Sequence, residues 1–116
     1  MEKKLNYLHL FESNTIKVKN AVGTTENGVN QLEKYFKKKY NIDIPTDWKC
    51  SLCEKKIVRK LSGNHPLFSK NDIMVGGHLE DVNTGYLYLA PICKECNDKK
   101  ENLREFTVDA NKLLLL

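Results

Sequence analysis

The chain has 116 residues, of which 41% are hydrophobic and 29% are charged, and it carries a formal net charge of +4. This length and composition are typical of one soluble globular domain, and they exclude an intrinsically disordered chain and a protein embedded in a membrane. The small positive excess does not by itself indicate a nucleic-acid partner, because the distribution of charge decides what a surface attracts.

The two ends of the sequence give no sign of targeting or of a membrane anchor. Residues 5–11 are apolar but contain Asn6 and His9, and no small-residue cleavage site follows, so we expect no signal peptide. The leucines at residues 113–116 are too few to span a bilayer, and they predict either a terminal strand or an exposed tail. We therefore expect a cytoplasmic protein without a membrane partner, in a reducing compartment.

The first 47 residues predict a strand followed by a helix. In residues 14–22 apolar and polar side chains alternate, which indicates a strand. A helix is predicted to start at residues 23–26, where Thr24 or Thr25 can cap its first turn. Four apolar residues at helical spacing define its buried face: Val29, Leu32, Phe36 and Tyr40.

Beyond residue 47 the pattern predicts short strands and a final helix. We expect one strand at residues 56–61 and, after a polar loop, two more at residues 73–81 and 86–92. An Asn-Thr-Gly sequence separates the last two strands, which is typical of a β-hairpin. Pro91 is expected to end the second strand of this hairpin, and residues 93–106 predict a charged helix.

All four cysteines fall into two Cys-x-x-Cys pairs. Cys50 and Cys53 form the first pair, and Cys93 and Cys96 form the second, with 39 residues between the pairs. A spacing of two residues lets one tight turn offer both thiolates to the same tetrahedral ion. The pattern therefore predicts one structural zinc ion held by the four thiolates, with no open position for a catalytic water.

Two other uses of the cysteines remain open, a redox pair and a set of unligated buried thiols. The order of elements favours zinc, since a cysteine turn, a hairpin, and a second pair at a helix start is the treble-clef arrangement. The helix dipole would stabilise the thiolates of Cys93 and Cys96. The metal would then fasten the helix to the first turn, in a domain too small to rely on apolar burial alone.

The half of the chain between Lys49 and Phe106 resembles the HNH endonucleases, the ββα-metal family. The resemblance rests on the two cysteine pairs, on the sequence Val-Gly-Gly-His-Leu that ends at Leu79, and on the sequence Cys-Lys-Glu-Cys-Asn-Asp that starts at Cys93. It implies that His78 is a general base acting on water. It further implies that Asn97 is a ligand of a second, catalytic ion such as Mg²⁺.

Two residues of the family's catalytic pattern are missing from this chain. Gly77 stands where the acidic metal ligand precedes the base, and Tyr88 stands near the place of the asparagine that orients the base. Glu80 lies on the same strand face as His78, about 7 Å away, and is a possible substitute carboxylate. His78 is otherwise a hairpin histidine that hydrogen-bonds to the backbone or to a helix start, without catalytic chemistry.

Two basic clusters are candidate phosphate contacts. Lys34, Lys37 and Lys38 lie in the predicted helix beside Tyr35 and Tyr40, and Lys55 and Arg59 follow the first cysteine pair. The alternative for the helix cluster is an ordinary solvated face.

These observations predict a small α+β domain with a treble-clef zinc core at residues 48–116 and a strand–helix extension at residues 1–47. We expect a module that binds DNA or RNA, with weak or absent nuclease activity. An active, metal-dependent HNH-type endonuclease is the first alternative. The second is a protein-interaction module that exposes Tyr86 and Tyr88 on the hairpin.

Overall fold

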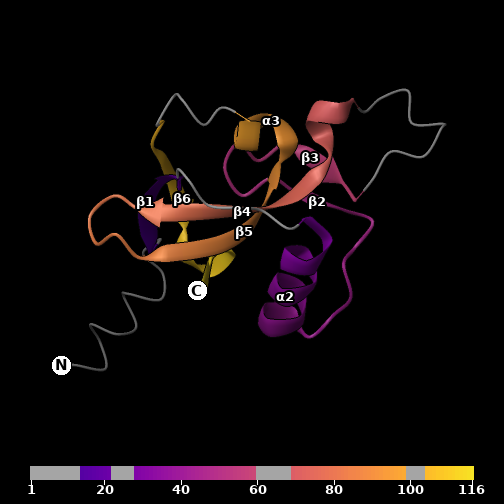
Figure 1. The fold of residues 1–116 in the computed structure, drawn as a ribbon, viewed down its shortest axis with the longest axis horizontal. Helices are drawn as coiled ribbons and strands as arrows, with labels where there is room; N and C mark the ends of the chain where they lie inside the picture. The colour runs from indigo at the N-terminus through magenta and orange to yellow at the C-terminus, as the bar shows by residue number, and fades with distance from the viewer. Residues whose placement is uncertain (1–13, 22–27, 60–68, 99–103) are drawn as a thin grey trace.

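A five-stranded antiparallel sheet forms the centre of the molecule, and the computed structural model describes residues 14–21, 28–59, 69–98 and 104–116 (Figure 1). The strand order is β6-β1-β4-β5-β7, and β2 and β3 form a second, two-stranded sheet. The strands are β1 (Thr15–Asn20), β2 (Asp47–Lys49), β3 (Lys56–Val58), β4 (Met74–Asp81), β5 (Leu87–Cys93), β6 (Phe106–Asp109) and β7 (Leu114–Leu115). The described helices are α2 (Gly28–Tyr40) and α3 (Lys94–Asp98), with 3-10 turns η1 (Lys70–Asp72) and η3 (Ala110–Lys112). The predicted α+β class is confirmed.

The predicted hairpin is formed by β4 and β5, which pair from Met74 opposite Cys93 to Glu80 opposite Leu87. The Asp81 side chain organises the turn, because its Oδ1 accepts hydrogen bonds from the backbone N–H groups of Asn83 and Thr84 at 2.8 and 3.2 Å. The hairpin carries the chain back to the second cysteine pair.

Pro91 lies inside β5, so the prediction that it ends the strand is wrong. Its carbonyl accepts a hydrogen bond from the Ser51 backbone N–H at 3.0 Å, on the side of β5 that faces the first cysteine turn. The missing N–H of Pro91 lies on that same side, and the ladder to β4 therefore loses nothing. The proline consequently sits where the edge of β5 that faces away from β4 meets the cysteine turn.

The strand predicted within residues 14–22 is confirmed as β1, which joins β4 on one side and β6 on the other. The predicted helix at residues 93–106 is only partly correct. Among the described residues it ends at Asp98, and Phe106 begins β6, opposite Val18. Phe106 and Val108 alternate with polar neighbours and add apolar side chains to the core, which favours a strand over a helix here. Both predicted segments, 1–47 and 48–116, thus contribute strands to one sheet.

The helix α2 packs across β4 and β5 through Leu32, Tyr35 and Phe36, all at most 3% exposed. Tyr35 replaces Tyr40 as a core residue, since Tyr40 is 41% exposed, and the side chain of Val29 lies outside the described residues. Gly76 permits the close packing, because a Cβ there would lie 2.6 Å from the Cβ of Gln31. The predicted helix start at residues 23–26 also lies outside the described residues.

The C-terminal leucines form a terminal strand, one of the two predicted alternatives. β7 pairs with β5, and Leu113 is buried in the core. Leu115 and Leu116 keep exposed fractions of 60% and 45%. Neither described helix has the length and apolar composition needed to cross a membrane.

Replacing Phe36 with alanine should lower the free energy of unfolding by about 3–5 kcal/mol, because it leaves a cavity between α2 and the hairpin. Urea unfolding followed by circular dichroism measures this. Tyr86→Ala, at a position that is 60% exposed, is the matched control and should change stability by less than about 0.5 kcal/mol. Equal losses in the two variants would contradict this description of the core.

Candidate metal centre

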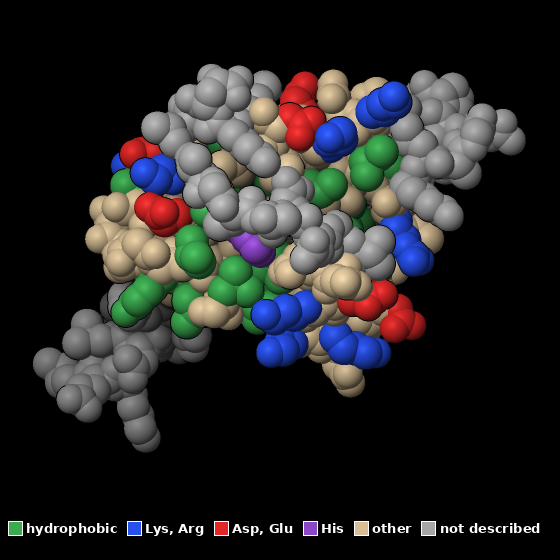
Figure 2. Space-filling model, in the orientation of Figure 1, with side chains coloured by type: hydrophobic (Ala, Val, Ile, Leu, Met, Phe, Trp, Pro, Cys, Tyr) green, Lys and Arg blue, Asp and Glu red, His purple; other side chains and the backbone are tan. Residues whose placement is uncertain are grey.

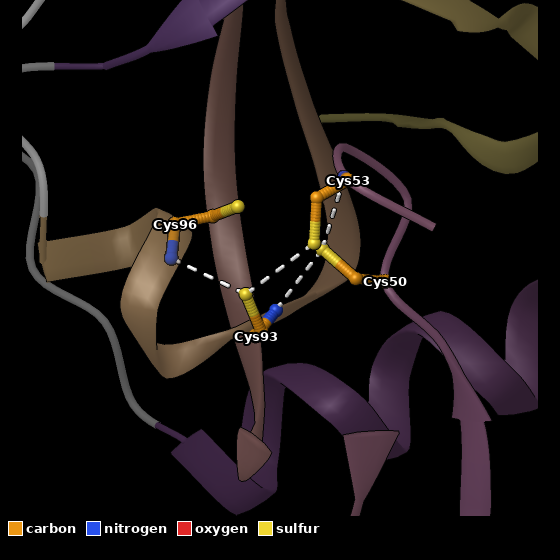
Figure 3. A group of neighbouring side chains, drawn as sticks. All are labelled: Cys50, Cys53, Cys93 and Cys96. Carbon is orange, nitrogen blue, oxygen red and sulfur yellow. Dashed lines mark hydrogen bonds between the residues drawn. The ribbon is translucent and has the colours of Figure 1, made fainter. Parts of the chain in front are cut away.

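The four cysteines come together at one end of the hairpin (Figure 3), where their sulfur atoms all lie within 4.8 Å of one another. Cys50 and Cys53 belong to the turn between β2 and β3. Cys93 ends β5, and Cys96 lies in the short helix α3. Among the described residues this is the one group of three or more His, Cys, Asp or Glu side chains close enough to hold a metal ion.

The spacing of the sulfur atoms fits a tetrahedral ion. Metal–sulfur bonds of about 2.3 Å place the corners of a tetrahedron about 3.8 Å apart. The Sγ atoms of Cys53 and Cys93 lie 3.8 Å apart, and all four cysteines are free thiols. Four sulfur donors of this kind suit a thiophilic divalent ion better than a hard cation such as Mg²⁺. The cluster could therefore hold one metal ion.

Backbone N–H groups point at two of the sulfur atoms, as expected around thiolates. The Sγ of Cys50 accepts from the backbone N–H groups of Leu52, Cys53 and Cys93 at 3.4, 3.5 and 3.2 Å. The Sγ of Cys93 accepts from the backbone N–H of Cys96 at 3.3 Å. Such bonds orient metal ligands and stabilise their negative charge.

The thiols compete for a single negative charge. Hydrogen bonds from the Cys93 and Cys96 thiols hold the pKa of Cys50 far below its usual range. The same sharing raises the pKa of Cys93 to about 12, chiefly through its bond to Cys50, and raises the pKa of Cys96 for the same reason. Ionising all four thiols together therefore needs a cation among them.

Several elements fix the cysteine turns. The first turn closes through hydrogen bonds from the Cys50 N–H to the Lys55 carbonyl at 2.8 Å and from the Glu54 N–H to the Cys50 carbonyl at 2.9 Å. Glu54 adopts a positive φ of 66°, as a tight turn requires. Asn20 of β1 donates from Nδ2 to the Cys96 carbonyl at 2.8 Å, which ties α3 to the sheet.

Lys55, predicted as a phosphate contact, lies in an ion-pair network beside the cluster. Its Nζ is 2.9 Å from Asp72 and 3.5 Å from Glu95. Partial burial acts to lower the pKa of Lys55, but the hydrogen bond to Asp72 and the nearby negative charges of Asp72 and Glu95 raise it overall. This ammonium group is thus already neutralised by acidic neighbours.

His78 is half-buried on β4, on the face that α2 covers. Its Nε2 lies 3.5 Å from Oε1 of Gln31, so its structural partner is a helix side chain rather than the backbone or a helix start. Glu80, the possible substitute carboxylate, lies 3.9 Å from the ammonium group of Lys19. Asn97 is buried in α3.

The position of the missing acidic ligand is occupied by the core. A Cβ at Gly77 would lie 2.3 Å from Cδ1 of Ile92, which belongs to the neighbouring strand β5. Neighbouring side chains on a strand point to opposite faces, so residue 77 projects away from the face of His78. Tyr88 pairs with Leu79 and packs against the core. A carboxylate at residue 77 therefore has no room without repacking Ile92.

The three lysines of α2 that were predicted as phosphate contacts are exposed, whereas Lys39 is half-buried and donates to the Leu113 carbonyl at 3.0 Å. Within the described part of the chain Lys34 and Lys38 have no ion-pair partner, and Lys37 lies 3.4 Å from Asp43. Arg59 and Lys37 line one hollow of about 510 Å³, but Glu33 and Asp43 line it too and balance its charge. Figure 2 shows a group of Lys and Arg side chains over α2 on the same face of the molecule as the histidine.

The tertiary structure also forms an aromatic hollow of about 750 Å³ that sequence reasoning missed. Its lining residues are Tyr40, Pro45, Asp47, Trp48, Lys49, Lys56 and Lys112. The only sequence feature that could have indicated it is the run of lysines on both sides of the first cysteine pair, next to Trp48. Tyr35, which lies beside the helix lysines in the sequence, faces the core instead, because its ring is buried and its hydroxyl donates to the Lys112 carbonyl at 2.6 Å.

Comparison of the chain with protein-family models, with curated proteins and with solved structures gives no match. The resemblance to HNH endonucleases accordingly rests on the motif residues of the sequence, and the function has to be argued from the geometry of the described residues.

Purified chain should contain one divalent metal ion, and Cys93→Ser should lose it together with most of the folded structure. Structural zinc sites of this kind contribute on the order of 10 kcal/mol to folding. Elemental analysis and thermal unfolding, before and after a strong chelator, measure both effects. Ser51→Ala, in the same turn but without a sulfur ligand, should keep the metal. A stable fold free of metal would overturn the assignment of this centre.

Proposed function

We propose that this chain is a structural-zinc domain of the treble-clef type, related to the HNH endonucleases, which binds nucleic acid without cutting it. Zinc is the ion of choice for a closed set of four thiolates, and it needs no further ligand there. The sequence of elements supports the treble clef, since β2 and β3 flank the first cysteine turn, and the β4–β5 hairpin leads to Cys93 and α3. Bound zinc would fasten these parts together and take no part in a reaction.

One observation carries the nucleic-acid proposal: the basic stripe of α2 lies on the face of the hairpin that bears His78. Gln31, Lys34 and Lys38 share one side of the helix, because residues three and seven apart lie above one another. Gln31 contacts His78, so the two lysines continue outward from that histidine. The resemblance to HNH endonucleases implies that His78 acts beside a phosphate, so the adjacent lysines, which have no ion-pair partner among the described residues, are suitable phosphate contacts.

Ile92 and Gln31, which lie next to Gly77 and His78 respectively, support the proposal that the chain does not cleave nucleic acid. Ile92 fills the place that an acidic ligand at residue 77 would need. Gln31 lies beside the His78 imidazole, and no carboxylate among the described residues joins His78 in a metal-binding group. A divalent ion that activates water needs such ligands, and Asn97 alone would hold Mg²⁺ weakly.

A protein-interaction role is the second candidate, favoured by one apolar surface. Tyr86 and Leu87 at the hairpin turn are 60% and 37% exposed, and Leu115 and Leu116 lie next to β5 with exposed fractions of 60% and 45%. Tyr88, which was expected to share this surface, is half-buried instead. Contiguous exposed apolar side chains of this kind often mark contact sites.

Changing Lys34, Lys37 and Lys38 together to glutamine should weaken nucleic-acid binding about tenfold or more at low salt. It should also reduce the slope of log affinity against log salt by about 2–3, because each of the three lost phosphate contacts releases about 0.7 counterions on a single strand and about 0.9 on a duplex. Fluorescence anisotropy of a labelled oligonucleotide measures both. Lys17, Lys70 and Lys94 changed together to glutamine give a control with the same net charge. Equal weakening in both variants would exclude α2 as the binding surface.

The zinc-loaded chain should not nick supercoiled plasmid with Mg²⁺ or Mn²⁺, and His78→Ala should leave that background unchanged. Gly77→Asp should destabilise the fold by about 1–3 kcal/mol through its clash with Ile92, and it should restore no cleavage. The double variant Gly77→Asp with Ile92→Ala serves as the control for crowding. Metal-dependent nicking that His78→Ala abolishes would contradict the proposal.

A further inference from the structure

The aromatic hollow lies beside the metal centre, between the end of α2, the β2–β3 sheet and the turn η3. Three of its lining side chains are lysines, Lys49, Lys56 and Lys112, and one is an acid, Asp47. Lys56 pairs with Asp47 at 3.5 Å and Lys112 pairs with Glu54 at 3.3 Å, so the positive charge of this lining rests mainly on Lys49, whereas the hollow that holds Arg59 is balanced by Glu33 and Asp43. Tyr40 and Trp48 add two aromatic rings to the same walls. A ligand that fits this hollow combines negative charge with a flat apolar group.

The rings of Trp48 and Tyr40 both pack against the buried ring of Phe36. Trp48 packs edge-on against Phe36, with ring centroids 5.0 Å apart and an interplanar angle of 84°. Tyr40 lies 5.6 Å from Trp48 and 6.2 Å from Phe36, and Phe36 itself is fully buried. The edge-to-face contact with Phe36 fixes the orientation of Trp48, and Tyr40 is tilted by 57° to Trp48 and by 33° to Phe36. The outer rings thus form a stacking platform that needs little ordering when a flat group binds.

The β2–β3 register places two like charges side by side. Lys49 lies directly opposite Lys56, and such cross-strand pairs have Cβ atoms about 4.5–5.5 Å apart. Asp47 lies 3.5 Å from the Lys56 ammonium group, but Lys49 has no ion-pair partner within the described residues. Like charges in directly opposed positions are unfavourable. An anion bound between these two lysines would remove the repulsion.

We propose that the aromatic hollow is a site for single-stranded nucleic acid, in which a base stacks on one of the two rings, Trp48 or Tyr40, which are inclined by 57° to each other, and the phosphates of the strand reach Lys49 and Lys56 of the same lining. This inference rests on the proposed nucleic-acid function and names the surface that reads an unpaired strand. A nucleotide carries a π-face and a phosphate in one unit, which matches the two kinds of side chain in the hollow. A duplex keeps its bases stacked on one another and cannot offer them to the rings. The lysines at the end of α2 adjoin Tyr40 and extend the basic path along the strand.

Trp48 is the only tryptophan in the chain, so its fluorescence reports on this hollow alone. The experiment titrates zinc-loaded full chain with an oligothymidylate of about 12 nucleotides, with the matching oligouridylate, and with a duplex of equal length. Anisotropy of the labelled oligonucleotide measures total binding in the same samples. We expect saturable quenching of Trp48 by single strands, with a midpoint equal to that of the anisotropy curve, and little quenching by the duplex. The DNA and RNA arms decide which sugar is preferred.

Two variants test the assigned roles. Tyr40→Ala should weaken single-strand binding about tenfold, the typical loss for one stacked base. Lys49→Gln should weaken it several-fold and lower the salt slope by about 0.7. Lys70→Gln, an exposed lysine that lines neither hollow, is the control with the same charge change and should bind as the parent chain does. Metal content and melting temperature establish that each variant is folded.

The outcomes separate this inference from the function on which it rests. Binding seen by anisotropy without quenching of Trp48, or binding that Tyr40→Ala and Lys49→Gln leave unchanged, overturns the site and keeps the proposed function. Equal quenching by duplex and single strand also overturns the stacking role. Failure of every oligonucleotide to bind at low salt overturns both.

Discussion

Four cysteine sulfur atoms converge on one point, and their positions constrain β2, β3, β5 and α3, the elements around them. The two pairs are 39 residues apart in the sequence, one in the turn of the two-stranded sheet and one at the start of the five-residue helix α3. The pKa values of Cys93 and Cys96 are raised because the thiols share one charge, so the cluster by itself resists full ionisation. A bound divalent cation would stabilise the ionised thiolates, and it would cross-link the turn between β2 and β3 to the end of β5 and to α3.

The β4–β5 hairpin and its neighbouring strand β1 connect the cysteine turns to the rest of the fold. The carbonyl of Pro91 accepts from Ser51, and Asn20 donates to the carbonyl of Cys96, so both cysteine turns are attached to the central sheet. On the other face of the hairpin, Gly76 lets α2 approach closely, and Phe36 and Trp48 then link the helix to β2. The metal centre, the helix and the aromatic hollow are therefore parts of one packed unit. Loss of the metal should affect any ligand site built on β2.

The same packing argues against catalysis and for binding. A strand that supplies a base and a metal ligand needs space on both of its faces, whereas β4 has Ile92 against Gly77 on one face and Gln31 against His78 on the other. Lysines require no such space, because long side chains reach solvent from a closely packed helix. Lys34 and Lys38 thus remain exposed on a helix that packs closely on β4. Under the proposed function, nucleic-acid binding would need only these lysines, whereas cleavage would need ligands for which β4 leaves no room.

Features of the fold that depend on local spacing could be predicted from the amino-acid sequence alone. Two Cys-x-x-Cys pairs predicted a shared four-sulfur cluster, alternation predicted β1, and Asn-Thr-Gly between apolar runs predicted the β4–β5 hairpin, because each follows from neighbouring residues. Four other features depend on contacts that form only in the folded chain. Phe106 lies in a strand because it pairs with Val18 of β1, and Pro91 remains in β5 because its carbonyl accepts a hydrogen bond from Ser51. A side chain at residue 77 has no room because Ile92 of the neighbouring strand occupies that space. Trp48 and Lys49 line a common hollow with Tyr40 and Lys112, because the end of α2 and the turn η3 lie beside β2. These outcomes depend on contacts between residues distant in the chain, which no local pattern records.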